Sequence, residues 1–215
     1  ATYDQSSKTN LALYWGQGGG QQRLQYFCEQ STVDVIPIGF IHIFPQQGNG
    51  FPGSNFANQC WGGTYVYPVG YIAMASRLRQ HFKTASKKYI LTAAPQCVVI
   101  DANMGALISQ VQFDIIFVQY YNTPQCSARN WVNANTNFAM DGVERTNGFT
   151  YNTWSNFLSG TMSANAKLYI GVPGAPDAGG FYLSPNEISL LIKAHFCKDN
   201  FGGVMIWEAT SAENN

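Results

Sequence analysis

The chain has 215 residues, with 12 basic and 12 acidic side chains and no net charge, and only 11% of its residues are charged. An average soluble domain carries about 25% charged residues, and proteins that bind nucleic acid or anionic membranes carry a basic excess that this chain lacks. The composition therefore excludes strongly basic binding proteins, while 14% aromatic residues and many amide side chains give a neutral chain suited to uncharged sugars or a cell wall.

The N-terminal part of the chain predicts an arm, two strands and a helix. Residues 1–10 are polar and predict a loose arm, and Leu11–Gln17 predicts a first strand. A run of glycines and a short helix around Phe27 follow. Val35–Phe44 predicts a second strand, and a loop rich in Gly, Asn and Pro extends from Pro45 to Pro68.

The middle of the chain alternates helix and strand. Tyr71–Phe82 predicts a helix, and Tyr89–Ala94 and Phe113–Asn122 predict the next two strands. Trp131 to Tyr151 is predicted to be a polar excursion, followed by a helix that contains Trp154.

The C-terminal part adds a strand, a helix and a last strand. Lys167–Val172 and Gly202–Glu208 are the predicted strands. The helix Ser184–Phe196 is marked by Ser184 as N-cap and by Glu187 three residues later, which is the capping-box spacing. The repeated β-α order favours the α/β class, with a parallel sheet or barrel.

The strand Phe113–Asn122 becomes polar only at its end, so we expect a site there. Because side chains alternate along a strand, Ile115, Phe117, Gln119 and Tyr121 share one face, and Ile116, Val118 and Tyr120 share the other. Two apolar faces are typical of a parallel strand covered on both sides. Ligands bind at the carboxyl ends of such strands, so Gln119 and Tyr121 should point into a shared site.

A disulfide between Cys97 and Cys126 is predicted from strand spacing. Cys97 lies just past the strand that ends near Ala94, and Cys126 lies just past the one that ends at Asn122. Neighbouring parallel strands lie about 4.8 Å apart, which brings the two loops within the roughly 4.4–6.8 Å Cα separation that a disulfide needs.

The compartment is predicted from what the sequence contains. The chain begins at Ala1 without a signal-like stretch, and no apolar run is long enough to span a bilayer, so we expect a processed, secreted protein. Five cysteines favour an oxidising compartment, and at least one of them lacks an internal partner. The histidines have no metal-ligand spacing, so we expect no metal and no cofactor.

Several short blocks occur in order along the chain. They are Leu-Tyr-Trp-Gly-Gln at 13–17, Ile-Gly-Phe at 38–40, Pro-Gly-Ser-Asn-Phe at 52–56, Leu-Thr-Ala-Ala-Pro-Gln-Cys at 91–97, Val-Gln-Tyr-Tyr-Asn at 118–122, Tyr-Ile-Gly-Val-Pro at 169–173 and Gly-Gly-Val-Met-Ile-Trp-Glu-Ala at 202–209. Together, and nearly end to end, they resemble the glycoside hydrolase family 18 chitinases of the plant class III type and their fungal relatives.

The resemblance implies a (β/α)8 TIM barrel that cleaves β-1,4-linked N-acetylglucosamine polymers. In this family a Glu protonates the glycosidic oxygen while the acetamido carbonyl of the sugar attacks the anomeric carbon, which is an exception to the two-carboxylate scheme. A neighbouring Asp orients the acetamide and a Tyr of the sixth strand hydrogen-bonds it. We expect a chitin or chitooligosaccharide ligand, a monomer, and a location outside the cell or in the fungal cell wall.

Residue by residue, the resemblance assigns a site. Tyr121 is similar to the tyrosine that holds the acetamide, Gln119 is its companion on the same strand face, and Trp207 is similar to the tryptophan floor beneath the sugar. Further residues that the resemblance places at the substrate are Tyr14, Gln17, Phe40 and Gln96.

The chain departs from the family at its centre. The Asp-Gly-x-Asp-x-Asp-x-Glu motif of the fourth strand and the Ser-x-Gly-Gly motif of the third are absent. The printed chain therefore predicts one incomplete barrel domain with six recognisable strands, an excision near Val69–Tyr71 and no final barrel helix after Asn215. Asp141 to Glu144 is expected to be a loop, not the lost motif. The partners of Cys28, Cys60 and Cys197 remain open.

Three hypotheses follow for the activity. The first is a secreted fungal-type chitinase whose acid-bearing strand is missing from the printed chain, so that the natural protein contains residues that this sequence lacks. The second is a chitinase-like lectin that has lost the acid and binds chitooligosaccharides without cleaving them. The third is a structural wall or storage protein. Glu208 points away from the face of Trp207 and is expected to make a structural hydrogen bond.

Overall fold

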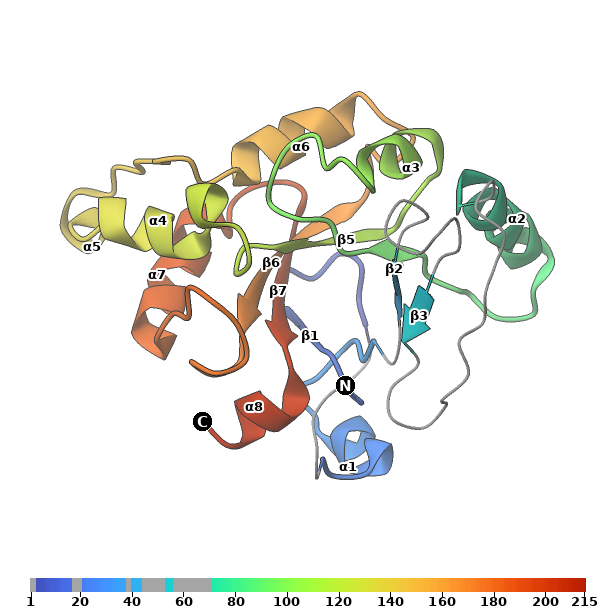
Figure 1. Cartoon of the computed structure of the whole chain (residues 1–215), viewed down its shortest axis with the longest axis horizontal. Helices are drawn as coiled ribbons and strands as arrows, with labels where there is room; N and C mark the ends of the chain where they lie inside the picture. Colours follow the sequence, from blue (N-terminus) through green and yellow to red (C-terminus); the bar gives the residue numbers. More distant parts are fainter. Residues whose placement is uncertain (1–2, 17–20, 38–39, 44–52, 56–70) are drawn as a thin grey trace.

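The main sheet of the protein consists of parallel strands that begin to form a barrel (Figure 1). The computed structural model describes residues 3–16, 21–37, 40–43, 53–55 and 71–215. Within them, a sheet of five strands has the order β1-β7-β6-β5-β4, and all of its pairs are parallel. The strands are β1 (Asn10–Leu13), β4 (Thr92–Ala93), β5 (Ile115–Gln119), β6 (Lys167–Pro173) and β7 (Phe201–Trp207).

Helices connect successive strands. They are α1 (Leu24–Glu29), α2 (Tyr71–Thr84), α3 (Gly105–Gln110), α4 (Ala128–Ala134), α5 (Phe138–Asp141), α6 (Tyr151–Ser159), α7 (Pro185–His195), α8 (Ala209–Glu213) and the 3-10 helix η2 (Pro124–Cys126). Among the described residues no helix is long and apolar enough to cross a membrane.

The strand order confirms the expected fold, an incomplete (β/α)8 barrel. β1 and β7 come from opposite ends of the chain, yet they pair over Asn10–Leu13 and Gly203–Ile206. On its other edge β1 meets Val35 through a parallel bridge at Ala12. The segment around Val35 and β4 therefore lie at the two edges of a curved sheet, and no strand among the described residues joins these edges.

The second predicted strand is only partly correct. Val35 bridges to β1, but the expected continuous strand Val35–Phe44 divides, and its later part forms β2 (Phe40–Ile43), which pairs antiparallel with β3 (Gly53–Asn55). Pro37, which cannot donate a backbone hydrogen bond, lies between the two parts. The prediction of one uninterrupted loop from Pro45 to Pro68 is also wrong, because β3 lies inside it; the rest of that loop is outside the described residues.

Two other segments differ in detail from the predictions. The polar excursion predicted from Trp131 to Tyr151 contains the end of α4 and all of α5, helices that the sequence prediction did not locate. The described part of the arm predicted at residues 1–10 is tied down, because Tyr3 packs against the interior of the sheet and Asn10 is buried at the start of β1. The polar sequence of the two segments predicts neither the helices nor the packing of the arm, because these depend on contacts with distant parts of the chain.

Two hydrophobic layers hold the sheet. Ile116 and Val118 of β5 point outward and pack with helix residues such as Trp131, Trp154 and Leu191. Figure 1 shows the corresponding helices, green to orange, around the outside of the strands. The other face forms a smaller interior cluster, whose buried members are Ala12, Tyr14, Ile115, Phe117, Tyr121, Tyr169 and Met205.

A buried histidine joins the last long helix to the turn after α5. The His195 side chain is fully buried, with Nδ1 2.8 Å from the Leu191 carbonyl oxygen and Nε2 3.1 Å from Glu144 Oε1. The same carboxylate oxygen accepts a hydrogen bond of 3.0 Å from Trp131 Nε1. The expected loop at Asp141 to Glu144 is therefore a structural turn, in which Glu144 links α4 to α7.

This link predicts a pH dependence of stability. The pKa of Glu144 lies below its ordinary value of 4.5, first because the carboxylate hydrogen-bonds His195. A lowered folded-state pKa gives stability that is present above the ordinary pKa and is lost as the pH falls through the folded-state value. We expect the melting temperature of the wild type to fall more steeply below pH 4.5 than that of Glu144→Gln.

The measurement is thermal unfolding between about pH 3 and pH 7, where carboxyl groups titrate. Glu213→Gln, which removes an exposed carboxylate from α8, is the matched control and should follow the wild type. Parallel curves for the wild type and Glu144→Gln would show that this carboxylate does not stabilise the fold.

Candidate functional site

The alternation predicted along β5 places its side chains on two faces of the sheet. Ile115, Phe117 and Tyr121 belong to the interior cluster, while Ile116 and Val118 belong to the outer one. Gln119 is partly buried and is the last residue of β5. The carboxyl end of this strand therefore presents Gln119 and Tyr121 on the interior side, as predicted.

Aromatic rings gather beside Tyr121. Trp207 is the last residue of β7 and Tyr14 directly follows β1, so the pairing of these strands brings the two rings to a centroid distance of 5.1 Å. Tyr14 also meets Phe117 edge to face at 6.4 Å. Tyr14 and Tyr121 are each 5% exposed, whereas Trp207 is only partly buried, so the indole is the ring of this group that solvent reaches.

Both tyrosines of this group remain neutral. Burial raises the pKa of Tyr121 above its ordinary value, and the neighbouring phenol of Tyr14 raises it further. Burial alone raises the pKa of Tyr14. Each phenol therefore keeps its proton throughout the usual pH range, and Tyr121 is equipped to donate a hydrogen bond.

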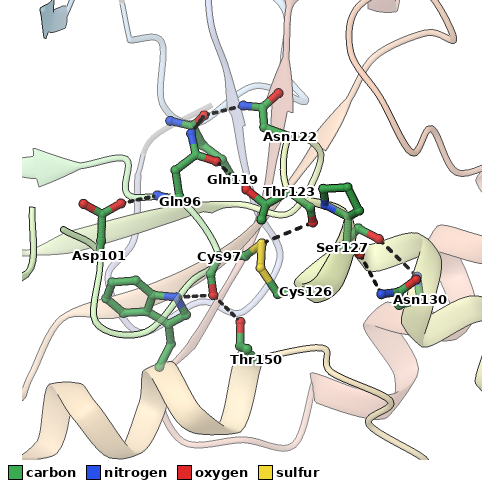
Figure 2. Close-up of a disulfide and its surroundings, with 12 residues drawn as sticks. Gln96, Cys97, Asp101, Gln119, Asn122, Thr123, Cys126, Ser127, Asn130 and Thr150 are labelled. Atoms are coloured by element: carbon green, nitrogen blue, oxygen red, sulfur yellow. Dashed lines mark hydrogen bonds between the residues drawn. A yellow bond between two sulfur atoms is a disulfide. The ribbon is translucent and has the colours of Figure 1, made fainter. Parts of the chain in front are cut away.

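Amide side chains form a ladder beside the rings (Figure 2). Gln119 Nε2 donates to the Ala94 carbonyl oxygen at 2.7 Å, and Gln119 Oε1 accepts from Gln96 Nε2 at 3.2 Å and from Asn122 Nδ2 at 2.8 Å. Thr123 Oγ1 donates to Gln96 Oε1 at 3.1 Å. The ladder joins the loops that follow β4 and β5 and fixes their side chains.

The predicted disulfide lies directly below this ladder. Cys97 and Cys126 are bonded, with their Cα atoms 5.8 Å apart, inside the range expected from strand spacing. The Cys97 carbonyl oxygen accepts hydrogen bonds from Thr150 Oγ1 at 2.6 Å and from Trp154 Nε1 at 3.2 Å, which ties the same loop to α6 (Figure 2). Cys28 and Cys197 are free and exposed, and Cys60 lies outside the described residues.

The segment between β6 and α7 packs on Tyr121. A side chain at Gly179 would lie 3.2 Å from a ring carbon of Tyr121, so a larger residue there would displace the segment or the ring. Arg129 of α4 secures the segment, because its guanidinium donates to the Tyr182 carbonyl oxygen and pairs with Glu187. The same Glu187 completes the predicted capping box of α7.

The buried carboxylates at this end of the sheet accept hydrogen bonds from backbone N–H groups. Asp101 accepts N–H bonds from Gln96 at 2.9 Å and from Met104 at 2.7 Å. Glu208 caps α8, accepting from the backbone N–H groups of Thr210 and Ser211, as the structural role expected for it requires. All 12 acidic residues of the chain lie in the described ranges.

One of the acidic residues, Asp177, lies in the loop after β6. It is exposed and makes no hydrogen bond with a described residue. Within the described ranges there is no group of three or more His, Cys, Asp or Glu side chains that could hold a metal ion. The arrangement instead offers neutral donors, neutral acceptors and apolar ring faces, which match the hydroxyl groups and ring faces of uncharged ligands.

Most of the predicted site residues come together. Tyr14, Gln96, Gln119, Tyr121 and Trp207 all lie at the carboxyl ends of β1, β4, β5 and β7. The last two predicted residues are not tested. Gln17 lies outside the described residues, and for Phe40 the structure describes only the backbone, which belongs to β2.

Sequence reasoning missed the residues that support these side chains. Asn122 and Thr123 directly follow Tyr121, and this polar step after an apolar strand was the available signal. For Asp101 and Arg129 the sequence carries no such signal, because their partners are backbone groups and a helix cap brought near only by the fold.

Comparison with known sequences finds fungal endochitinases. No protein-family model matches the chain. Endochitinase A1 of Aspergillus fumigatus is 31% identical over an alignment of 310 residues that takes in 100% of this chain and 34% of the relative. A probable endochitinase of Arthroderma benhamiae is 32% identical over 99% of this chain and 42% of the relative. The chain therefore spans less than half the length of these relatives, and the alignments are longer than its 215 residues.

Solved structures share the fold and differ in their descriptions. A xylanase and α-amylase inhibitor protein from Scadoxus multiflorus superposes with a TM-score of 0.70 at 22% identity, covering 96% of this chain and 95% of that one. The ICChI chitinase from Ipomoea carnea gives 0.68 at 21% identity, with coverages of 95% and 96%. A tamarind chitinase-like lectin gives 0.63 at 17% identity, with coverages of 93% and 94%. Proteins with this fold are thus described as an inhibitor, a chitinase and a lectin, so the fold alone does not determine the function.

The disulfide should stabilise the part of the fold that holds the site. It closes a loop with a sequence separation of 29, for which chain entropy gives about 3–4 kcal/mol. We expect the double variant Cys97→Ala, Cys126→Ala to lose about that much free energy of unfolding, measured by urea denaturation.

The variant Cys28→Ala, Cys197→Ala is the matched control, since both thiols are free and exposed. It should change the free energy of unfolding by less than about 0.5 kcal/mol per site. Equal midpoints for the two double variants would contradict a stabilising role for the disulfide.

Proposed function

Because the chain belongs to the chitinase type of glycoside hydrolase family 18, we propose that it binds β-1,4-linked N-acetylglucosamine chains at the carboxyl ends of its strands. The activity of the natural protein is then endo-hydrolysis of chitin with retention of configuration. The observation that carries the proposal is the grouping of Tyr121, Trp207 and Tyr14 with the amides of Gln119 and Gln96.

Each group has a defined part in the proposed reaction. The Trp207 ring is the floor on which the apolar face of a pyranose stacks. Tyr121, kept protonated by burial, donates to the acetamide carbonyl oxygen and holds it for attack on the anomeric carbon. Gln119, fixed by the ladder, keeps the end of β5 in position. Protonation of the leaving oxygen needs a carboxylic acid, which comes from outside the residues described above.

We place that acid on a segment between Gly70 and Tyr71 that the natural protein contains and this sequence lacks. Two observations support the placement. Among the described residues no strand joins the Val35 segment to β4, and these two edges of the main sheet come before and after that point in the chain. The alignments with the endochitinases are also longer than the chain. Two further strands would fill the opening and bring a carboxyl group opposite Tyr121.

A second candidate function is sugar binding without hydrolysis. Its support is that the buried carboxylates nearest the strand ends, Asp101 and Glu208, are both committed to backbone N–H groups. A chain with no additional segment would keep the stacking ring and the neutral donors and would act as a lectin. In both cases the ligand is a neutral chitin fragment met outside the cell, where the Cys97–Cys126 bond persists.

Peptide mapping and an activity assay separate the two functions. In the hydrolase, no proteolytic peptide contains residues 65–77 in uninterrupted order, additional peptides appear, and the purified protein releases short oligomers from chitin. In the lectin, the uninterrupted peptide is present, and chitotetraose binds but is not cleaved. A protein that neither binds nor cleaves chitotetraose would refute both functions.

The role of Tyr121 is tested by Tyr121→Phe. Removal of one hydrogen-bonding hydroxyl should weaken chitotetraose binding by about 5–10-fold, and should lower kcat in a protein that hydrolyses. Calorimetric titration measures the affinity. The ring stays in place, so the melting temperature should change little.

Tyr120→Phe is the matched control, because Tyr120 is the adjacent residue, is also buried, and packs on the outer face of the sheet. It should bind chitotetraose as the wild type does. Equal affinities for the two phenylalanine variants would remove Tyr121 from the site.

A further inference from the structure

The orientation of the amide ladder is determined by one backbone carbonyl group. The Ala94 oxygen can only accept a hydrogen bond, and the atom of Gln119 that meets it at 2.7 Å must therefore be Nε2. Gln119 Oε1 consequently faces the opposite way. Any side chain that contacts Oε1 has to present a donor.

Two amides contact Gln119 Oε1, and both are thereby oriented. Gln96 Nε2 and Asn122 Nδ2 donate to it, so each turns its own oxygen away. The oxygen of Gln96 is occupied by the Thr123 hydroxyl at 3.1 Å. No hydrogen bond from the described residues reaches Asn122 Oδ1, and Figure 2 shows it directed away from Gln119.

Asn122 lies where a ligand at the strand ends would pass. It directly follows Tyr121 and hydrogen-bonds Gln119, so its side chain lies at the end of the interior face. Unlike Tyr121, it is exposed to solvent. The ladder therefore ends in a single carbonyl oxygen that is fixed in direction and open to a donor.

We propose that Asn122 Oδ1 is a specificity-determining contact of the bound sugar, where it accepts a hydrogen bond from an amide N–H or a hydroxyl group. The inference rests on the proposed function and adds a residue to it. Tyr121 and Asn122 then offer one donor and one acceptor side by side. A neutral N-acetylated sugar can satisfy an oriented amide oxygen without bringing a charge to the site.

The substitution Asn122→Asp tests the contact through selectivity. A carboxylate keeps the acceptor but attracts the protonated amine of a deacetylated sugar, and it loses the donor to Gln119 Oε1. We expect the ratio of affinities, glucosamine tetramer over N-acetylglucosamine tetramer, to rise by about tenfold relative to the wild type at low salt and about pH 6. Asn122→Ala, which adds no charge, should weaken binding of the acetylated tetramer by about 5–10-fold.

Asn133→Asp and Asn133→Ala are the matched controls, since Asn133 is an exposed asparagine of α4 on the outer side of the sheet. Titration calorimetry with both tetramers gives the affinities, and thermal melting checks that each variant is folded. If Asn122→Asp does not fold, the comparison of Asn122→Ala with Asn133→Ala decides.

The outcomes separate the two proposals. A wild-type protein that binds neither tetramer overturns the proposed function and the contact with it. A wild-type protein that binds chitotetraose, with Asn122 variants that behave like the Asn133 controls, overturns the contact alone. A wild-type protein that binds, with a selectivity change confined to Asn122→Asp, supports both.

Discussion

The pairing of β1 with β7 is the interaction on which the rest of the structure depends. It joins the two ends of the chain, and it requires Gly203, whose φ is +141° and whose missing Cβ would otherwise strike the Asn10 carbonyl oxygen. Beyond the strand, Tyr14 N donates to the Ile206 oxygen at 3.3 Å, so the register continues to the end of the sheet. For this reason Tyr14 and Trp207, nearly 200 positions apart in the chain, form one aromatic surface.

The opposite side of the barrel has no such closure. β4 has only two residues and pairs with β5, and the Val35 segment is tied to β1 by backbone hydrogen bonds from Leu13 to Val35 and from Val35 to Leu11. An unpaired edge exposes backbone groups, and a barrel is the arrangement that removes such edges. The side where β1 pairs with β7 carries the neutral half of the proposed site. The proposal places the acid on the other side, in a segment that would join the two edges of the sheet.

The sequence predicts the features that depend on local pattern, and it does not predict those that depend on contacts between residues far apart in the chain. Alternation along β5, the capping box at Ser184 and Glu187, and the Cys97–Cys126 bond follow from spacing, and all are confirmed. The site residues on strand ends follow from strand direction and from family resemblance. Neither source gives the orientation of the Gln119 amide, because that depends on a carbonyl group 25 positions away. For the same reason, the sequence does not predict that Tyr3 packs in the interior or that Glu144 contacts α7.

In the proposed site, the described residues supply affinity and the missing acid supplies rate. An interaction accelerates a reaction only if it is stronger in the transition state than in the bound substrate. In the proposed reaction, stacking on Trp207 and hydrogen bonds to Asn122 involve parts of the sugar that change little during cleavage, so they bind both states alike. In the same proposal Tyr121 contributes more to the transition state, because it orients the attacking acetamide, but it cannot protonate the leaving oxygen while burial keeps its pKa high. Hydrolase and lectin can thus share this half of the site unchanged and differ by one carboxyl group on the opposite side.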